Sequence, residues 1–394
     1  MNRYLLAGTA IAALAAPLAA QTTIDSRRTA PITTSALKNG AGDSVRVTDK
    51  GSVELTSGAA ITLDSNHAIV NEGKIAVTNA EGGSGIVVAG DRTGNITNSG
   101  TITVDETYAP TDSDNDKDLD GPFAVGSNRA AIRVQGKLAG QISHTGTISV
   151  EGNNSAGILV QDTLTGSLIH DGKTTVLGDN SVGVDVRAVT GDVRLAGTVA
   201  ASGFGATGAR FRGDIGGGLT VQVEIASTGY RYPAPPADAS KLDSDDLLQG
   251  GSAVLVEGSV AKGIIFAVAP KDTKPDDADE DKDGLADAKE GSAKVTSYGA
   301  APAVLIGASD RDIVIGAVPG TGTGFGIVVD GAIAGHGVYA GVVGNGMVVG
   351  GRGGAVSVNN GIAVSGTITA SSKDASATAL RLGSGARVPE LRNS

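Results

Sequence analysis

Apolar residues recur in pairs spaced two residues apart along most of the chain, usually behind a small residue. These pairs are Ile86/Val88, Ile132/Val134, Ile158/Val160, Val184/Val186, Ala209/Phe211, Val254/Val256, Val304/Ile306, Ile362/Val364 and Leu380/Leu382. A spacing of two places both side chains of a pair on the same face of a β-strand, so each pair predicts a short strand with one buried face. Ile132, Ile158 and Val184 follow one another at intervals of 26 residues. The pattern therefore predicts a repeat of about 25 residues.

Two further strands recur at fixed distances behind each leading pair. Apolar or β-branched residues lie ten and sixteen positions later: Ile96, Ile142 and Leu168, and then Ile102, Ile148 and Thr174. Parallel strands from successive repeats stack at about 4.8 Å, and the connections between such strands are almost always right-handed. We therefore predict an all-β fold, a right-handed parallel β-helix with three strands per coil of about 25 residues and about twelve coils in all.

One corner of the predicted coil carries a restricted set of residues. The position four residues before each leading strand is occupied only by Gly or Asn: Gly82, Asn128, Asn154, Asn180, Gly205 and Gly250. These two residue types adopt a positive φ at low cost. The sequence therefore predicts a left-handed backbone conformation at this corner in each coil.

The repeat is interrupted three times, and each interruption predicts an inserted loop. The inserts span about 105–127, 230–249 and 270–291. The first two break the repeat at the same point, so they should leave the same edge of the helix, four coils or roughly 19 Å apart. The third should leave a different corner. The predicted organisation is then a lead-in or cap over 21–50 and a β-helix over 51–394, whose register is not predicted beyond Gly320.

The first twenty residues predict export. Arg3 is followed by the apolar stretch Leu5 to Leu18 and by Ala19 and Ala20, which is the pattern of a secretory signal peptide over residues 1–20. The chain is therefore expected to pass through the inner membrane and to act at the cell surface or outside the cell.

The composition narrows the function classes. The chain has 394 residues, no Cys, 40% hydrophobic residues and only 3% aromatic residues, so burial and main-chain pairing must hold it together without disulfides. A net charge of -11 argues against nucleic acid as a partner, because phosphate binding needs clustered Lys and Arg. The chain has no Gly-x-Ser-x-Gly nucleophile motif. We expect no enzyme activity, with a secreted polysaccharide-active β-helix enzyme as the alternative.

The third insert has the spacing of a twelve-residue calcium loop. Oxygen ligands would come from Asp279, Asp281, Asp283, the Leu285 carbonyl, Asp287 and Glu290, and Gly284 stands at the sixth position, where the loop bends sharply. The alternative is a solvated acidic loop, and no flanking helices of an EF-hand are evident. We predict a structural Ca²⁺ site in this insert.

Two other groups of polar residues are candidate ligands. The first insert alternates Asp112, Asp114, Asp116, Asp118 and Asp120 before Gly121, but it lacks the Glu of a complete loop, so a weaker Ca²⁺ site and a mobile acidic loop are equally supported. The second insert offers Asp243, Asp245 and Asp246, for which we favour a solvated loop. His144 and His170 share one register, and we predict a polar ladder on the solvent face in preference to a transition-metal site.

The coil consensus, as in Gly157-Ile-Leu-Val160 and Gly146-Thr-Ile-Ser-Val150, resembles the passenger region of bacterial autotransporters, the type V secreted proteins. The resemblance extends from about residue 50 over most of the chain and is closer to the Gly-rich autotransporters of sphingomonad-type bacteria, which have stretches like Tyr230-Arg-Tyr-Pro233 between their coils. It implies a surface scaffold or adhesin whose partners are surface glycans, host or neighbouring cells, or copies of itself.

The resemblance also implies a C-terminal outer-membrane barrel in the full-length protein. No series of amphipathic strands follows Leu382, and Asn393-Ser394 stand where Asn98-Ser99 stand in an earlier coil. We therefore interpret the chain as a truncated passenger or as the N-terminal piece of a longer protein.

Overall fold

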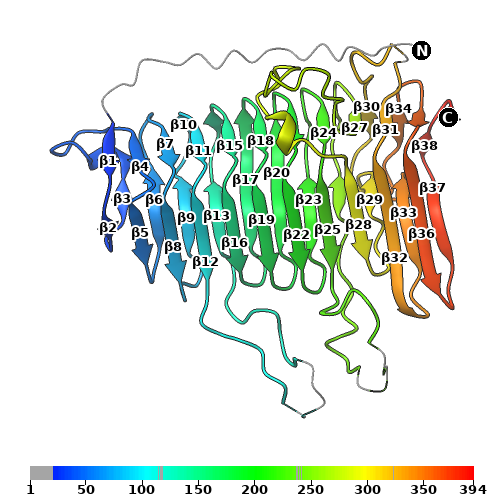
Figure 1. Cartoon of the computed structure of the whole chain (residues 1–394), viewed down its shortest axis with the longest axis horizontal. Coiled ribbons are helices and arrows are strands. Elements are labelled where there is room, and N and C mark those ends of the chain that lie inside the picture. The colour runs from blue at the N-terminus through cyan, green and yellow to red at the C-terminus, as the bar shows by residue number, and fades with distance from the viewer. Residues whose placement is uncertain are drawn as a thin grey trace.

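Short parallel strands stack into three long sheets, which wind into one column (Figure 1). The computed structural model describes residues 21–113, 115, 119–236, 238, 240, 242–322 and 324–394. The predicted signal peptide, residues 1–20, lies outside the described residues. The predicted all-β parallel β-helix is confirmed, because successive strands along the chain fall in different sheets and each strand pairs in parallel with the strand one coil away.

Each of the three sheets contains one strand from nearly every coil, in the pairing order that follows. Sheet A comprises β1 (Thr22–Ile24), β4 (Val45–Val47), β7 (Ile69–Asn71), β11 (Ile96–Asn98), β15 (Ile142–His144), β18 (Leu168–His170), β21 (Val193–Leu195), β24 (Leu219–Val221), β27 (Ile264–Phe266), β31 (Ile327–Val329), β35 (Ile362–Val364) and β39 (Leu391–Asn393). Sheet B comprises β2 (Arg27–Arg28), β5 (Ser52–Leu55), β8 (Lys74–Thr78), β12 (Thr101–Asp105), β16 (Thr147–Glu151), β19 (Lys173–Leu177), β22 (Thr198–Ser202), β25 (Glu224–Thr228), β28 (Lys294–Tyr298), β32 (Ala332–Ala340) and β36 (Thr367–Lys373). Sheet C comprises β3 (Ile32–Thr33), β6 (Ala59–Leu63), β9 (Ser84–Val88), β13 (Ala130–Val134), β17 (Ala156–Thr165), β20 (Val182–Val189), β23 (Thr207–Phe211), β26 (Val254–Val256), β29 (Val304–Ile306), β33 (Gly344–Val349) and β37 (Ala377–Leu382).

The predicted register holds through the regular coils. Ile132 pairs with Ile86 on one side and with Ile158 on the other, and Ile158 pairs with Val184. The two other predicted rows, at offsets of ten and sixteen residues, are also each in one sheet. All of these leading residues are fully buried, so the apolar pairs do mark the inner faces of the strands.

Beyond Gly320, where the register is not predicted, Ile362 and Val364 form a strand as expected, but it is not the leading strand of its coil. They form β35 in sheet A, where Ile362 pairs with Ile327. The leading strand of that coil is β33, in which Met347 pairs with Val304. The apolar-x-apolar pattern behind a Gly occurs in both sheets, so it cannot identify the sheet once the coil length departs from about 25 residues.

The predicted left-handed corner is confirmed at five of its six positions. The φ angles are 65° at Gly82, 59° at Asn128, 51° at Asn154, 55° at Asn180 and 65° at Gly205. The prediction is wrong for the sixth position, Gly250, whose φ lies outside the left-handed region. The second insert rejoins the coil there, and a Cβ on Gly250 would lie 2.6 Å from the carbonyl carbon of Thr228. Glycine is needed there because the main chain of Thr228 lies too close to leave room for a side chain.

A short fourth column, between sheets C and A, was not predicted. It contains β10 (Arg92–Thr93), β14 (Leu138–Ala139), the ends of β17 and β20, single bridges from Val189 through Ile215 and Val260 to Ile315, and then β30 (Ile313–Ile315), β34 (Val356–Val358) and β38 (Ala386–Arg387). Its inward residues, such as Leu138 and Leu164, are fully buried. Most coils supply only one apolar residue to this column. The two-residue spacing from which the other strands were predicted is therefore missing there.

The predicted solvent-facing ladder of His144 and His170 is wrong in its placement. Both rings are fully buried inside the column, where they continue a row that contains Asn71 and Asn98. His144 lies two residues after the buried Ile142, and alternation along a strand puts both side chains on the inner face. A ladder exists, but it is an internal one.

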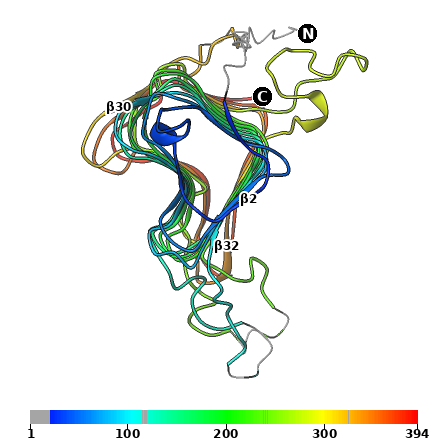
Figure 2. The same ribbon diagram turned by 90° about the vertical axis from the view of Figure 1, so that its left-hand side faces the viewer.

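The two ends of the column differ. At the N-terminal end the short turn η1 (Thr34–Ala36) and the following Leu37 pack against the core, and Figure 2 shows this turn lying across the cross-section. Strands of all three sheets already lie within residues 21–50. At the other end Leu382 and Leu391 are 47% and 53% exposed.

The first two inserts leave one corner of the column, and the third leaves another. The first insert leaves the column after Asp105, the last residue of β12, and returns before β13, and residues 230–249 lie between β25 and β26, so both leave where sheet B passes to sheet C. Four steps of sheet B separate β12 from β25. In Figure 1 both loops project from the same edge, while the third insert, between β27 and β28, lies on the opposite side.

Candidate metal centre

Three carboxylates of the third insert converge. Asp279, Asp281 and Asp283 each offer an oxygen, and these oxygens all lie within 4.8 Å of one another. They occupy the first, third and fifth positions of the predicted calcium loop. The structure therefore brings together the first half of the predicted ligand set.

The backbone of the loop supports this convergence. The amide of Asp283 donates to Asp279 Oδ1 and to Asp281 Oδ1, both at 3.1 Å, and the amide of Gly284 donates to Asp279 Oδ2 at 3.2 Å. Gly284 has a φ of 87°, which reverses the chain at the predicted sixth position. The short turn η3 (Asp287–Lys289) follows. Amide donors thus hold the carboxylates in place and offset part of their mutual repulsion.

Arg194 fastens the loop to the column. Its guanidinium contacts Asp171 through Nη2 to Oδ2 at 2.6 Å and through Nε to Oδ1 at 3.1 Å. The remaining nitrogen, Nη1, donates to the Asp283 carbonyl at 2.8 Å and lies 3.1 Å from Asp283 Oδ2. Arg194 is in β21, two strands of sheet A before β27, so the insert folds back over earlier coils.

The second half of the predicted ligand set lies near the first. Burial, together with the carboxylates of Asp281, Asp283, Asp287 and Asp279, raises the pKa of Glu290 to about 7. One buried oxygen of Asp287 and one of Glu290 have no hydrogen-bond partner. These are oxygens that a cation would satisfy. The Leu285 side chain is 4% exposed, and the role of its carbonyl oxygen as a ligand stays a prediction.

A second acidic cluster joins the first two inserts. Oxygens of Asp120, Asp243 and Asp245 lie within 4.8 Å of one another, although Asp120 belongs to the first insert and the other two belong to the second. The amide of Gly121 donates to Asp245 Oδ2 at 2.7 Å. Sequence reasoning treats the two loops separately and misses this juxtaposition. Their departure from one corner is the signal that could have indicated it.

Arg231 lies against this second cluster. Its side chain is 8% exposed, it donates to the Gly121 carbonyl, and its Nε lies 3.9 Å from Asp245 Oδ2. The guanidinium also stacks 4.7 Å from the centre of the Phe123 ring. One positive charge therefore already compensates part of this cluster, as Arg194 does at the third insert.

The aspartate run of the first insert is only partly described. Asp114, Asp116 and Asp118 lie outside the described residues. Asp112 Oδ1 accepts a hydrogen bond from the amide of Asn115 at 2.7 Å, and Asp120 belongs to the cluster shared with the second insert. The predicted weaker Ca²⁺ site over this run stays a prediction.

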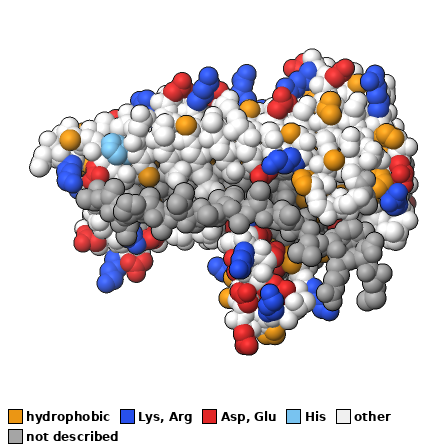
Figure 3. Space-filling view, turned by 90° about the horizontal axis from the view of Figure 1, so that it is seen from above, with side chains coloured by type: hydrophobic (Ala, Val, Ile, Leu, Met, Phe, Trp, Pro, Cys, Tyr) orange, Lys and Arg blue, Asp and Glu red, His pale blue; other side chains and the backbone are white. Residues whose placement is uncertain are grey.

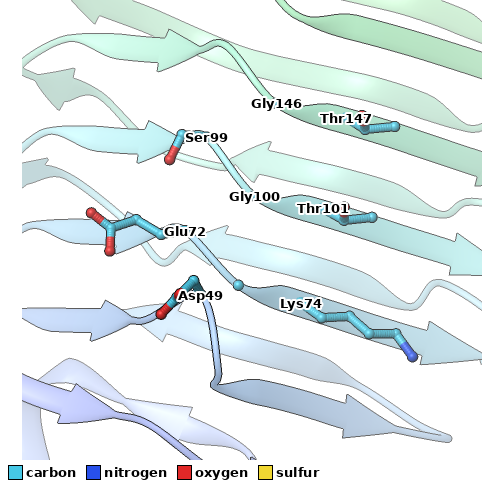
Figure 4. Close-up of a pocket in the computed structure, with 9 residues that line it drawn as sticks. Asp49, Glu72, Lys74, Ser99, Gly100, Thr101, Gly146 and Thr147 are labelled. Atoms are coloured by element: carbon cyan, nitrogen blue, oxygen red, sulfur yellow. The ribbon is translucent and has the colours of Figure 1, made fainter.

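A shallow groove follows the corner between sheets A and B in the early coils. Backbone at Gly73, Gly100 and Gly146 forms its floor, and the side chains around it are those of Asp49, Glu72, Lys74, Ser99, Thr101 and Thr147 (Figure 4). Glu72 pairs with Arg46 at 2.8 Å, and Lys74 pairs with Glu54 at 3.3 Å. The groove offers hydroxyl, carboxylate and ammonium groups along the corner on which the third insert lies further on.

The charge of the chain is concentrated in the inserts. The three inserts, 65 residues in all, hold 20 of the 42 acidic residues and 7 of the 31 basic residues. The remainder holds 24 basic and 22 acidic residues and is close to neutral. Figure 3 shows red and blue side chains gathering on a lobe that projects beside the column, while much of the column surface is white.

In comparisons with known proteins, no family model, curated protein or solved structure matches the chain. Within the part of the chain that the structure describes, no helix is both long enough and apolar enough to cross a membrane.

Proposed function

We propose that the chain is an exported cell-surface scaffold, the passenger part of an autotransporter, and that its third insert binds Ca²⁺. The observation that carries the calcium part is the convergence of Asp279, Asp281 and Asp283 in a loop clamped to the column by Arg194. A long column with short polar corners can hold loops at fixed spacing away from a surface. Partners of this scaffold would be surface glycans, host or neighbouring cells, or other copies of the chain.

The chemistry of the insert favours a hard divalent cation. Ca²⁺ takes six to eight oxygen ligands, and carboxylates are the strongest of these. Without a cation, like charges within a few ångströms destabilise the loop, as the raised pKa of Glu290 indicates. With Ca²⁺ the same carboxylates become attractive contacts. Because Arg194 already offsets one charge, we expect an affinity of about 10⁻⁴ to 10⁻³ M, in the range of extracellular modules.

Calorimetric titration of the whole purified chain with Ca²⁺ tests this site. We expect about one ion bound at the third insert and slower proteolysis of that insert when Ca²⁺ is present, because binding favours the closed loop. The variant Asp279→Asn/Asp281→Asn/Asp283→Asn removes three charges with little change of shape and should abolish the heat.

A matched variant controls for the general loss of negative charge. Asp272→Asn/Asp276→Asn/Asp277→Asn lies in the same insert but outside the cluster, and it should keep the binding heat. If the wild-type chain gives no heat, or if both triple variants lose it equally, the calcium assignment is wrong.

Export is tested at the N-terminus of the protein. When the chain is expressed in a bacterium with an outer membrane, we expect the product recovered outside the inner membrane to begin at Gln21, because cleavage follows the small residues Ala19 and Ala20. Replacing the apolar Leu5 and Leu6 with Asp should retain the chain, with Met1 or Asn2 at its start, in the cytoplasm. Export of that variant at the wild-type level would contradict the proposal.

A further inference from the structure

Four polar side chains form a row inside the column, whose core is mostly apolar. The third residue of the sheet A strand is Asn71 in β7, Asn98 in β11, His144 in β15 and His170 in β18, and these strands are direct neighbours. All four side chains are fully buried. In the next strand the same position is Leu195, and the row becomes apolar.

Hydrogen bonds fix the protonation state of His144. Asn71 Nδ2 donates to Asn98 Oδ1 at 2.6 Å, so the amide nitrogen of Asn98 is the atom that faces His144 Nδ1, at 2.9 Å. An amide nitrogen only donates, so His144 Nδ1 must accept. The ring proton then lies on Nε2, which donates to the Lys173 carbonyl at 3.2 Å. A second proton on Nδ1 would set two donors against each other.

His170 has no place for a second proton either. Its Nε2 lies 2.8 Å from Thr174 Oγ1, and its Nδ1 is buried without a partner. The two rings meet edge to face with their centres 4.9 Å apart. Two imidazolium rings at that distance would repel each other in a medium of low dielectric constant.

In the part of the chain that the structure describes, neither ring forms an ion pair. The side chains that contact the rings are Asn98 at His144 and Thr174 at His170, the two rings contact each other, and Leu195 follows His170 in the row. Alternation places the charged residues of the packed strands on the outer face; these are Glu151, Lys173, Asp185 and Arg194, and Asp171 beyond the end of β18 pairs with Arg194. Burial lowers the pKa of His144, and burial with the neighbouring His144 lowers the pKa of His170 to about 3.

We propose that the His144–His170 pair makes the column acid-sensitive at one place, so that acidification opens the coils of β15 and β18 before the rest. Each coil of a solenoid contacts only its neighbours, so one weak junction can open locally. An opened coil exposes both rings to water, where the ordinary pKa is 6.5. Stabilisation by the neutral pair is complete above about pH 6.5 and is lost as the pH falls towards the folded-state values.

Hydrogen–deuterium exchange of the whole chain between pH 7.5 and 4.5, corrected for intrinsic exchange rates, tests this location. One proton taken up on opening lowers amide protection about tenfold per pH unit, and two protons lower it about a hundredfold. We expect such a fall below pH 6.5 in peptides that contain β15 and β18. Peptides that contain β31 and β35, where the row is apolar, should change much less.

Variants separate the pair from other titrating groups. His144→Asn/His170→Asn extends the asparagine row and should flatten the pH dependence of these peptides. His170→Leu introduces the residue found at the next position of the row, Leu195, and should reduce the dependence of amide protection on pH by one proton. This variant replaces the double variant if the double variant does not fold. His67→Asn/His336→Asn, at two partly exposed rings, should leave the slope unchanged. If the pH dependence of these peptides in His170→Leu stays as steep as in the wild-type chain, or if all peptides share one pH dependence, the proposal is wrong.

Discussion

The coils and the inserts are stabilised in different ways. A coil buries one or two apolar residues from each strand and pairs its main chain with both neighbours, and it is close to electrical neutrality. The inserts account for all of the net negative charge and contain few described strands or helices. They depend on a small number of polar contacts with the column or with each other, such as Arg194 to Asp283 and Gly121 to Asp245.

This difference shows where specificity can reside on such a scaffold. The coil tolerates Asn, His, Leu or Phe at one inward position without loss of register, because main-chain pairing sets the geometry. An insert has no such repeated constraint. Its conformation depends on a few charged residues, so it can respond to ions, while the coil fixes the position from which it projects.

The largest effect is expected where coil and insert meet, at Arg129. Its side chain is 3% exposed and pairs at 2.8 Å with Glu106, which is 4% exposed and also accepts from the amides of Val125 and Gly126 at the base of the first insert. Arg129→Ala would leave the Glu106 carboxylate buried without its cation. We expect a loss of about 3 to 5 kcal/mol in the free energy of unfolding, measured by chemical denaturation.

An exposed ion pair provides the matched control for Arg129. Arg27 pairs with Glu54 at 2.8 Å, but its side chain is 66% exposed. Water screens such a pair, so Arg27→Ala should cost about 1 kcal/mol or less. Similar losses in the two variants would mean that the base of the insert contributes no more than a surface contact.

The coil could be predicted from the sequence because its information is repeated. Ile132, Ile158 and Val184 recur at a constant interval, and Asn128, Asn154 and Asn180 mark the same corner in the same coils. The strand positions assigned in one coil therefore predict those of the next coil, and the next coil's sequence can be checked against them. After Gly320 the coil length changes and the pattern no longer indicates the sheet: Ile362, which has the same apolar spacing, lies in sheet A.

The contacts of the inserts could not be predicted in the same way. The ligand spacing of the third insert is local, so sequence reasoning identified Asp279, Asp281 and Asp283 as one group. The approach of Asp120 to Asp245 and the contact of Arg194 with Asp283 each join residues about a hundred positions apart, and these residues share no periodic relation. Alternation along the strand indicates that the His144 side chain points inward. The sequence interpretation placed it on the solvent face because histidine is polar. The hydrogen bond with Asn98 explains why the core can hold this ring.

A smaller effect, confined to the coil, is expected at Gly146. This residue is at the corner between sheets A and B, and a Cβ there would lie 2.0 Å from the carbonyl oxygen of Gly100 in the neighbouring coil. The Gly100 oxygen and the Cα of residue 146 both belong to main chain that the stacking holds in place, so no flexible side chain can move aside. Gly146→Ala should therefore destabilise the fold by about 1 to 3 kcal/mol in chemical denaturation.

Gly218 separates this stacking effect from the general consequence of adding a methyl group. Like Gly146 it has no positive φ, but the nearest atom to its Cβ position, the Lys262 carbonyl oxygen, is 3.4 Å away. Gly218→Ala restricts the unfolded chain and should be neutral or stabilising by about 0.4 to 1 kcal/mol. Opposite signs at the two glycines would show that close main-chain stacking selects glycine in the coil, and a tolerated Gly146→Ala would show that neighbouring coils can move apart locally.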